Sequence, residues 1–356
     1  MAPRPRAAVA AGVAAVQRQA HPWEVTAPDF FTDAERVRML VAGLIGAHSD
    51  DIALLPSVSY GIGTAASNLP VEDGQRILVL AEQFPSNVYP WRERATSAGG
   101  EVVTVPRPSD SDWTAAVLEH LDERVAVVAV PNCHWTDGTA VDLEAVGSRA
   151  REVGAALVVD GSQSIGAMPF DVNIVQPDFL VTAAYKWLLG PYSMAFLYAA
   201  PGRQAGIPLE HNWITRRGSS DFARLVDYTD DFEPGARRYD VGERSNFTLL
   251  PMVIAALELI TEWGVDFIAA ALRHRTSDLA ARAEAAGFEV AADSHRSPHL
   301  VGLRSAEGLD PSLAPSLAAD SVIVSVRGDS IRVSPHLYNT DDDVDRLFAA
   351  LGRSPR

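Results

Sequence analysis

One side chain in this sequence offers a chemistry that no other residue of the chain can supply. Lys186 is the only lysine among 356 residues, and the other 29 of the 30 basic side chains are arginines. An arginine cannot replace a lysine where the amine must lose its proton and attack a carbonyl, because the guanidinium group stays charged. Lys186 follows an apolar run at 179–185, so we expect a buried amine rather than an accidental survivor of codon bias. The position favours a Schiff-base lysine.

Polar side chains also follow the other short apolar runs that resemble strands. The run at 125–130 leads to Asn132 and His134, and the run at 156–159 leads to Asp160 and Gln163. Ligands of doubly wound parallel sheets bind beyond the carboxyl ends of the strands. We therefore expect these groups to gather around Lys186. The candidates at the strand ends are Phe84, Asn132, His134, Asp160, Gln163, Tyr185 and Lys186.

This combination of groups matches the chemical needs of pyridoxal 5′-phosphate. The aldehyde of that cofactor requires a lysine, and its ring nitrogen requires a carboxylate such as Asp160 to stay protonated as an electron sink. The ring requires an aromatic cover, for which Phe84 is a candidate, and the phosphate requires free N–H groups at a helix start. The segment at 57–64 can supply that start. Each feature alone also has a structural reading, as a helix cap, a core residue or a turn; their order and co-location favour the cofactor.

Three motifs in this order resemble the fold-type I, class V aminotransferase superfamily. They are Val158-Val-Asp-Gly-Ser-Gln-Ser-Ile-Gly166, then Tyr185-Lys186 with Gly190-Pro191, and Ile331-Arg-Val-Ser-Pro-His-Leu-Tyr-Asn-Thr340. The resemblance covers nearly the whole chain and is nearest to the isopenicillin N epimerase-like branch; kynureninases and cysteine desulfurases are also similar. It implies an α/β fold of PLP-dependent transferase type I, with a large domain around a mostly parallel central sheet and a smaller α+β C-terminal domain.

The resemblance also implies a role for each matched position. Lys186 would form the internal aldimine and move protons at the substrate α-carbon, and Asp160 would pair with the pyridinium nitrogen. The implied cofactor-binding residues are Ser59, Tyr60, Phe84, Asn132, Asp160, Gln163, Tyr185, Lys186, Ser245 and Asn246, the last two serving a neighbouring subunit. Arg332 would grip the substrate carboxylate, and Asn132 would lie near the substrate. His134 is added from its strand-end position as a substrate contact or proton relay, although a lone histidine is usually structural.

The reaction that follows α-proton removal is less closely specified. A β-elimination, for example by a C–S lyase through a quinonoid, needs few groups beyond these, so a lyase ranks first. Transamination needs a second substrate, and epimerisation needs a second acid, for which Tyr60 and His134 are candidates. Desulfurase chemistry is disfavoured because 309–325 contains no cysteine. The kynureninase reading is weakened, but not excluded, because Gln163 stands where the resemblance implies a histidine. An inactive binding protein is the non-enzyme alternative, and retention of Lys186 argues against it.

Composition limits the partners. The net charge of −16 argues against a nucleic-acid groove, and no stretch is apolar and long enough to cross a membrane. The one cysteine, Cys133, excludes an intrachain disulfide and a cysteine-rich metal site, so we expect no metal and a cytoplasmic location. The alanine-rich run at 7–16 mimics a signal peptide, but we interpret it as a helix of the folded protein. The expected partners are an amino-acid substrate and a second copy of the chain in a homodimer that completes the active sites.

The chain divides into three expected parts. They are an N-terminal arm at 1–30 that packs with the small domain, a large PLP-binding domain at 31–248 and a small C-terminal domain at 249–356. Alternating strands and helices from about 76 predict right-handed crossovers into a parallel sheet. Short strands are expected near 287–292, 299–304, 321–326 and 330–334, before a closing helix from about 341. The irregular segment 201–247 is expected to be a long active-site or subunit-contact loop, or a poorly ordered segment.

Overall fold

The structure is a computed structural model of the chain and describes residues 2–353. Within that range, seven strands form one sheet in the order β1-β7-β6-β5-β4-β2-β3. The strands are β1 (Ile52–Leu55), β2 (Arg76–Leu80), β3 (Glu101–Val105), β4 (Val125–Pro131), β5 (Ala156–Asp160), β6 (Phe179–Ala183) and β7 (Ala195–Ala199).

The sheet is mostly parallel, as the alternation of strands and helices predicts. Strands β3, β2, β4, β5 and β6 pair in parallel, whereas β7 pairs antiparallel with both β6 and β1. A short connection at 184–194, without a crossover helix, joins β6 to β7, so the chain returns in the opposite direction. Strands β4 to β7 are buried along their whole length, which explains why they read as unbroken apolar runs.

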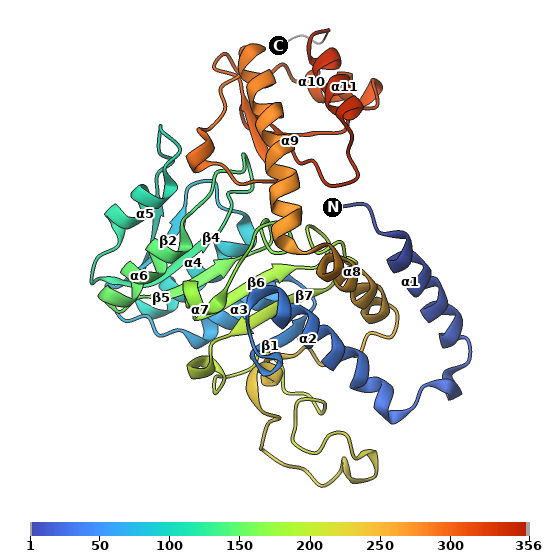
Figure 1. Cartoon of the computed structure of the whole chain (residues 1–356). Helices are drawn as coiled ribbons and strands as arrows, with labels where there is room; N and C mark the ends of the chain where they lie inside the picture. The colour runs from blue at the N-terminus through green and yellow to red at the C-terminus, as the bar shows by residue number, and fades with distance from the viewer. Residues whose placement is uncertain (1, 354–356) are drawn as a thin grey trace.

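Helices cover both faces of the sheet (Figure 1). Neighbouring strand residues point to opposite faces: Leu78 belongs to one hydrophobic core and Val79 to the other. The Val79 core includes side chains of α3 (Val58–Asn68) and α4 (Tyr89–Ala98). The Leu78 core includes side chains of α1 (Arg6–Gln19), α2 (Thr32–Ile45), α5 (Trp113–His120), α6 (Leu143–Val153), α7 (Val172–Val175) and α8 (Leu249–Trp263).

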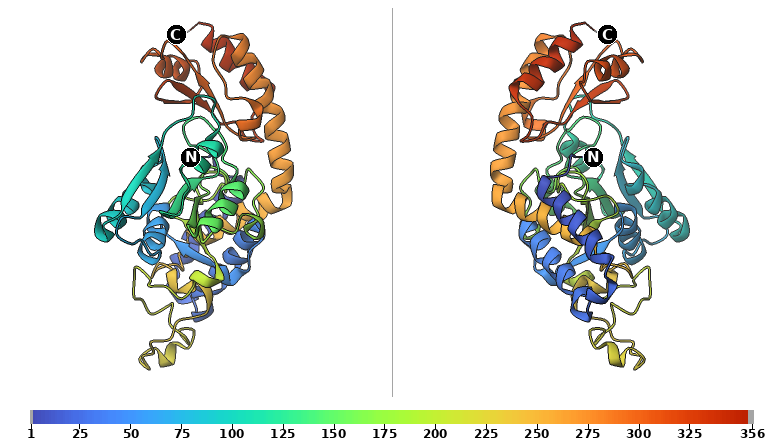
Figure 2. Two further views of the ribbon diagram at one scale, coloured as in Figure 1. Left: turned by 90° about the vertical axis from the view of Figure 1, so that its left-hand side faces the viewer. Right: turned by 90° about the vertical axis from the view of Figure 1, so that its right-hand side faces the viewer.

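A smaller unit follows at the C-terminal end. In the described part of the chain its sheet has three antiparallel strands in the order β8-β10-β9, namely β8 (Val301–Arg304), β9 (Ser325–Arg327) and β10 (Ser330–Val333). Three helices pack around a separate core: α9 (Val265–Ala285), α10 (Leu313–Ala319) and α11 (Asp341–Leu351). The long α9 runs from the large unit up to the small one (Figures 1 and 2).

Two details of the small unit differ from the sequence-based expectation. Residues 287–292 form no strand, and an isolated bridge between Glu289 and Arg304 is what links them to β8. The pattern also missed α10, because seven residues that include Pro315 are too short to show a helical period.

The segment 201–247 is irregular, as predicted. Its regular elements are short 3-10 turns: η5 (Pro201–Arg203), η6 (Phe222–Arg224) and η7 (Gly235–Tyr239). It projects from the large unit on the side away from the small one (Figure 2). Val226 and Tyr228 in this segment are strongly exposed, which leaves apolar side chains free for contact with another surface.

The N-terminal helix α1 packs against α8. Side chains of α8, including Leu250 and Leu257, lie in the same core as the large sheet. By packing, α8 therefore belongs with the large unit, although the expected boundary assigns it to the small domain. The boundaries at 30 and 248 stay predictions.

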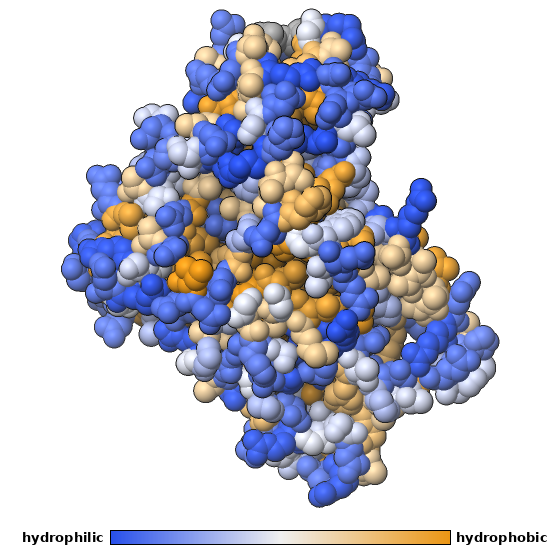
Figure 3. Space-filling model, viewed as in Figure 1, coloured by the Kyte–Doolittle hydropathy of each residue, from blue (hydrophilic) through white to orange (hydrophobic). Residues whose placement is uncertain are grey.

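The described residues contain no helix that is both long enough and apolar enough to pass through a membrane. On the face shown in Figure 3, hydrophilic side chains dominate the small unit, and hydrophobic side chains gather across the middle, over the large unit.

Candidate active site

Lys186 lies in the short connection between β6 and β7. Its Nζ is 5.3 Å from the centre of the Phe84 ring and 5.9 Å from that of Tyr185. Burial lowers the pKa of the amine, the nearby Asp160 carboxylate partly offsets this effect, and the Arg332 guanidinium adds to it. A lysine with a lowered pKa is more often neutral, and therefore more nucleophilic, than a solvated one.

Asp160 occupies the last position of β5, next to the strand that leads to Lys186. The sheet register pairs Asp160 with Pro131 on one side and Val181 on the other. Its carboxylate is buried and accepts a hydrogen bond of 3.0 Å from the Ser162 backbone N–H. The parallel strands thus bring the carboxylate and the amine to the same edge of the sheet, as predicted.

A cavity of about 270 Å³, which we call the inner cavity, lies on one side of Lys186. Its lining includes Ser57, Ser59, Phe84, Ser162, Tyr185 and Lys186. Ser57 caps the start of α3, since its Oγ accepts a hydrogen bond of 3.2 Å from the Tyr60 N–H. The N-terminus of an eleven-residue helix, with its free N–H groups and positive dipole end, therefore adjoins this cavity.

A second cavity of about 500 Å³, the substrate cavity, lies on the other side of Lys186. Its lining includes Gln163, Lys186, Arg332, His336 and Tyr338, together with Ala2 and Pro3 of the N-terminal arm. The arm is held by a backbone hydrogen bond of 3.3 Å from the Ala2 N–H to the Tyr185 carbonyl. Lys186 therefore lines both cavities.

Arg332 extends from β10 into the wall of the substrate cavity. Its Nη1 donates a hydrogen bond of 2.6 Å to the Trp135 carbonyl. Its Nε is buried and has no hydrogen-bond partner among the residues that the structure describes. A buried, unsatisfied guanidinium N–H is costly unless a ligand accepts from it, which is consistent with the predicted carboxylate contact.

Asn132 and Gln163 are both buried at strand ends near Lys186. Asn132 Nδ2 donates to the Val141 carbonyl at 3.3 Å, and its Oδ1 has no partner within residues 2–353. Gln163 Oε1 accepts from Trp187 Nε1 at 3.4 Å, and its carbonyl bonds His299. Gln163 lines the substrate cavity, whereas Asn132 lines neither cavity.

The structure does not bring His134 into either cavity. Its ring is fully buried and stacks on Trp113, with centroids 5.1 Å apart. Its Nδ1 bonds the Thr136 hydroxyl at 2.7 Å and its Nε2 bonds the Ala81 carbonyl at 3.1 Å. Both ring nitrogens are therefore engaged, and burial lowers the pKa of the imidazole. This is the geometry of a structural histidine, so contact with the substrate would require these bonds to break.

Four further predicted residues, Asp160 among them, also lie outside both cavities. The Tyr60 hydroxyl bonds Glu210, and burial together with that carboxylate raises the pKa of the phenol. Ser245 Oγ donates to the Phe30 carbonyl, and Asn246 Oδ1 accepts from the Leu249 N–H at 2.9 Å. The expected role of Ser245 and Asn246 in a neighbouring subunit stays a prediction.

The predicted set left out many residues of the two cavities and their walls, including Ser57, Ser162, His336 and Trp135. Ser57 and Ser162 line the inner cavity, His336 lines the substrate cavity, and Trp135 lies between Phe84 and Arg332. Ser57 and Ser162 stand inside the motifs that carried the prediction, so their hydroxyls were available as a signal. The places of Trp135 and His336 depend on how the small unit packs on the large one, which no local pattern reveals.

The residues of the inner cavity fit pyridoxal 5′-phosphate. Ser162 Oγ is buried without a hydrogen-bond partner among the described residues, at a site where a phosphate oxygen could accept from it. Ser57 Oγ and Ser59 Oγ lie 2.9 Å apart at the start of α3 and supply further donors. Phe84 lies beside the amine as a ring cover, and the Asp160 carboxylate lines neither cavity but is close enough to the amine to raise its pKa.

The chain is similar over most of its length to proteins of one family. The family model described as "Aminotransferase class-V" matches residues 10–347. An uncharacterized aminotransferase, YcbU, from Bacillus subtilis is 27% identical over 325 residues, which cover 87% of this chain and 80% of that protein. Isopenicillin N epimerase from Streptomyces clavuligerus is 26% identical over 333 residues, covering 89% of this chain and 83% of the epimerase.

Among solved structures, the cystine C-S lyase C-DES in complex with cysteine persulfide shares the fold. Its TM-score is 0.87 at 18% sequence identity, and the match covers 99% of this chain and 95% of that chain. With the family match, the geometry and these relatives in agreement, the chain belongs to the class-V aminotransferase family. It is an enzyme of PLP fold type I, and pyridoxal 5′-phosphate is its cofactor.

Proposed function

We propose that this enzyme is a lyase that catalyses β-elimination from an α-amino acid carrying a leaving group on Cβ, for example a C–S bond. The observation that carries the proposal is that Lys186, whose amine has a lowered pKa because of burial, lines both the inner cavity and the substrate cavity. One base in that position is sufficient for β-elimination. The similarity to C-DES, whose fold this chain shares, is consistent with the proposal.

The roles proposed for the residues follow from their positions. Pyridoxal phosphate supplies an electron sink for the negative charge that develops at the substrate α-carbon. The Asp160 carboxylate would keep the ring nitrogen protonated, and the start of α3 with Ser57 and Ser59 would hold the phosphate. The Arg332 guanidinium orients the substrate through its carboxylate.

Lys186 Nζ then acts as the general base. It takes the proton from Cα, and the electron pair released there forms the Cα–Cβ double bond as the Cβ–S bond breaks. The leaving sulfur keeps the electron pair of that bond as a thiolate, to which the protonated amine can return a proton. Phe84 and Trp135, whose rings meet edge to face with centroids 5.5 Å apart, form an aromatic pair beside the amine.

Transamination is the second candidate, favoured by the similarity to YcbU from Bacillus subtilis, whose name describes an aminotransferase. Epimerisation is less well supported, although the epimerase from Streptomyces clavuligerus is also similar. It needs an acid on the face opposite Lys186, and neither candidate lines a cavity. Tyr60 bonds Glu210, and His134 is buried with both nitrogens bonded.

We further propose that the enzyme is a cytoplasmic homodimer. Exposed apolar side chains on α1, among them Val13 and Val16, and Tyr228 in the 201–247 segment support a protein partner. The low cysteine content supports a reducing compartment. Sedimentation at micromolar concentration tests the oligomeric state, and a monomer would contradict this proposal.

Absorbance and product analysis test the catalytic proposal. Purified protein should show visible cofactor absorbance that borohydride bleaches, with the label on Lys186, while Lys186→Ala should carry no borohydride-stable label. Incubation with a panel of cysteine conjugates should release pyruvate and ammonia in equal amounts. Stoichiometric conversion of the cofactor to its pyridoxamine form, with a keto acid retaining the substrate side chain, would replace the lyase assignment by transamination.

A further inference from the structure

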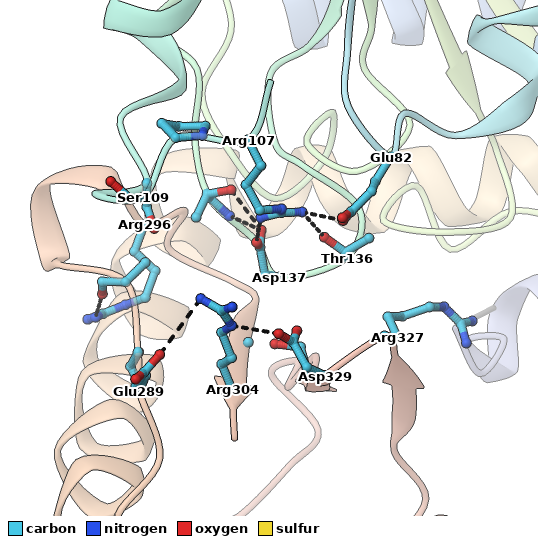
Figure 4. Close-up of a pocket in the computed structure, with 18 of the residues that line it drawn as sticks. Glu82, Arg107, Ser109, Thr136, Asp137, Glu289, Arg296, Arg304, Arg327 and Asp329 are labelled. Atoms are coloured by element: carbon cyan, nitrogen blue, oxygen red, sulfur yellow. Dashed lines mark hydrogen bonds and ion pairs between the residues drawn. The ribbon is translucent and has the colours of Figure 1, made fainter. Parts of the chain in front are cut away.

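A third cavity of about 720 Å³, the outer cavity, opens between the large and small units beyond Trp135 (Figure 4). Four arginines line it: Arg107, Arg296, Arg304 and Arg327. Acidic side chains neutralise the first three. The ion pairs are Arg107 with Glu82 and Asp137, Arg296 with Asp293, and Arg304 with Glu289 and Asp329.

Arg327 is the exception in this cavity. It forms no ion pair with any residue in the described range 2–353. Its Nη1 donates to the carbonyl of the preceding Val326 at 2.8 Å, and its Nε is buried without a partner there. In Figure 4 its side chain extends away from the ion pairs of Arg107 and Arg304. The outer cavity therefore has one arginine that forms no ion pair with the described residues, although five carboxylates line the same cavity.

Arg327 and Arg332 project from the same face of the small sheet. In the antiparallel pair of β9 and β10, Arg332 lies opposite Ser325, and Arg327 lies opposite Ser330. Directly opposed residues share a face, and so do residues two apart along a strand. The two arginines are therefore diagonal neighbours, a spacing that long side chains can bridge.

Trp135 connects the two guanidinium groups. Its carbonyl accepts the hydrogen bond from Arg332, and its ring lies 5.4 Å from Arg327 Cζ. The same indole packs against Phe84 beside Lys186. Arg332 lines the substrate cavity and Arg327 lines the outer cavity, and Trp135 contacts both. Two unbalanced like charges at this spacing repel, and an anionic ligand would relieve that repulsion. Consistent with this, burial and then Arg327 lower the pKa of Arg332.

We propose that the substrate of this enzyme carries a second anionic group, which Arg327 binds while Arg332 binds the α-carboxylate. This inference rests on the proposed function, since it takes the α-amino acid to lie in the substrate cavity. The preferred substrates are amino acids with a distal carboxylate, long enough to extend past the Trp135 indole into the outer cavity. Because the whole chain carries a net charge of −16, attraction of such a substrate depends on local cations of this kind.

The test uses two cysteine conjugates that differ in charge and little in size. S-(2-carboxyethyl)-L-cysteine has a distal carboxylate, and S-(2-carbamoylethyl)-L-cysteine has the amide in its place. Dissociation constants come from the change in cofactor absorbance when each compound binds to the holoenzyme, so the readout needs no turnover. The wild-type enzyme should bind the carboxylate at least about tenfold more tightly than the amide, as a charge-assisted hydrogen bond in a partly buried site allows.

Arg327→Gln should reduce that preference to near unity and leave binding of the amide unchanged. Arg304→Gln is the matched control: it removes a positive charge from the same cavity, but one already paired with Glu289 and Asp329. The Arg304→Gln variant should keep the preference for the carboxylate compound over the amide.

Three results would overturn the inference: equal binding of both compounds by wild type, equal weakening of both by Arg327→Gln, or loss of the preference in Arg304→Gln. The charge preference without pyruvate release would refute the lyase proposal and leave this inference standing. Pyruvate release from both compounds with no charge preference would refute this inference and leave the lyase proposal standing.

Discussion

Two glycines in α3 provide a matched test of how the start of that helix is held against the sheet. A Cβ atom on Gly61 would lie 2.6 Å from Val181 Cγ1 and 3.0 Å from Leu55 Cδ1. A Cβ atom on Gly63 would have Leu209 Cδ1 as its neighbour within 4 Å, at 3.6 Å, which is an ordinary contact. Gly61→Ala and Gly63→Ala are thus the same change, two residues apart, with and without a clash.

The two substitutions should change stability with opposite signs. Alanine in a helix interior is about 1 kcal/mol more favourable than glycine, so Gly63→Ala should raise the free energy of unfolding by up to that amount. At Gly61, overpacking against the buried strands β1 and β6 costs about 1–3 kcal/mol. The net expectation for Gly61→Ala is a loss of about 0–2 kcal/mol. The difference between the variants measures the clash itself.

The clash at Gly61 should also displace residues that line the inner cavity. Val181 lies in β6, five residues before Lys186, and relief of the contact moves α3 away from the sheet together with Ser57 and Ser59. A loss of about 1.4 kcal/mol in binding would weaken cofactor affinity about tenfold in Gly61→Ala, whereas Gly63→Ala should bind the cofactor like wild type.

Urea unfolding of the apoprotein, followed by circular dichroism, gives the stability difference, and absorbance titration with pyridoxal phosphate gives the affinity. Equal stability of the two variants would refute the packing argument. An equal loss of cofactor affinity in both variants would show that the position of the α3 N-terminus does not depend on the close packing at Gly61.

Two further predictions concern pH. Burial lowers the pKa of Lys186, so between the folded value and the unfolded value of about 10.4 the unfolded state binds more protons and stability rises with pH. Lys186→Met should therefore stabilise the apoprotein at pH 7, and the gain in unfolding free energy should vanish near pH 10.5; a gain that is independent of pH would contradict this. Burial lowers the pKa of His336 to about 4, below an unfolded value of about 6.5, so the wild type loses stability as the pH falls through this window. His336→Phe should remove part of that loss between pH 7 and pH 4.5 in urea unfolding, and an unchanged pH dependence would refute the assignment.

Much of the fold was predictable because its signals are local. Buried parallel strands read as unbroken apolar runs, and the boundaries of β2, β5 and β6 follow from those runs. The edge strand β3 was also predicted within its boundaries, although Val105 is its one fully buried residue. The antiparallel direction of β7 was not predictable in the same way, since a strand has the same apolar pattern in either direction. The helix α10 was missed because it is too short to show a period.

Some residues of the candidate site were likewise predictable from local sequence, and others were not. Lys186 and Asp160 were identified from their types and their places at strand ends, and parallel pairing brings such ends to one edge. His134 has the same kind of position but is turned into the core, where Thr136 and the Ala81 carbonyl occupy its nitrogens. Residue type and strand position do not determine which way a side chain points after the strand has ended.

By itself, the sequence predicted a reactive amine at Lys186, a carboxylate partner at Asp160 and the cofactor, and the family match confirms the cofactor. The chain contains one lysine, and only an amine that can lose its proton performs that chemistry. Only the tertiary structure decided what surrounds the far end of a substrate. Trp135 comes from the large unit and Arg327 and Arg332 from the small one, so their common site exists only once the two units pack together.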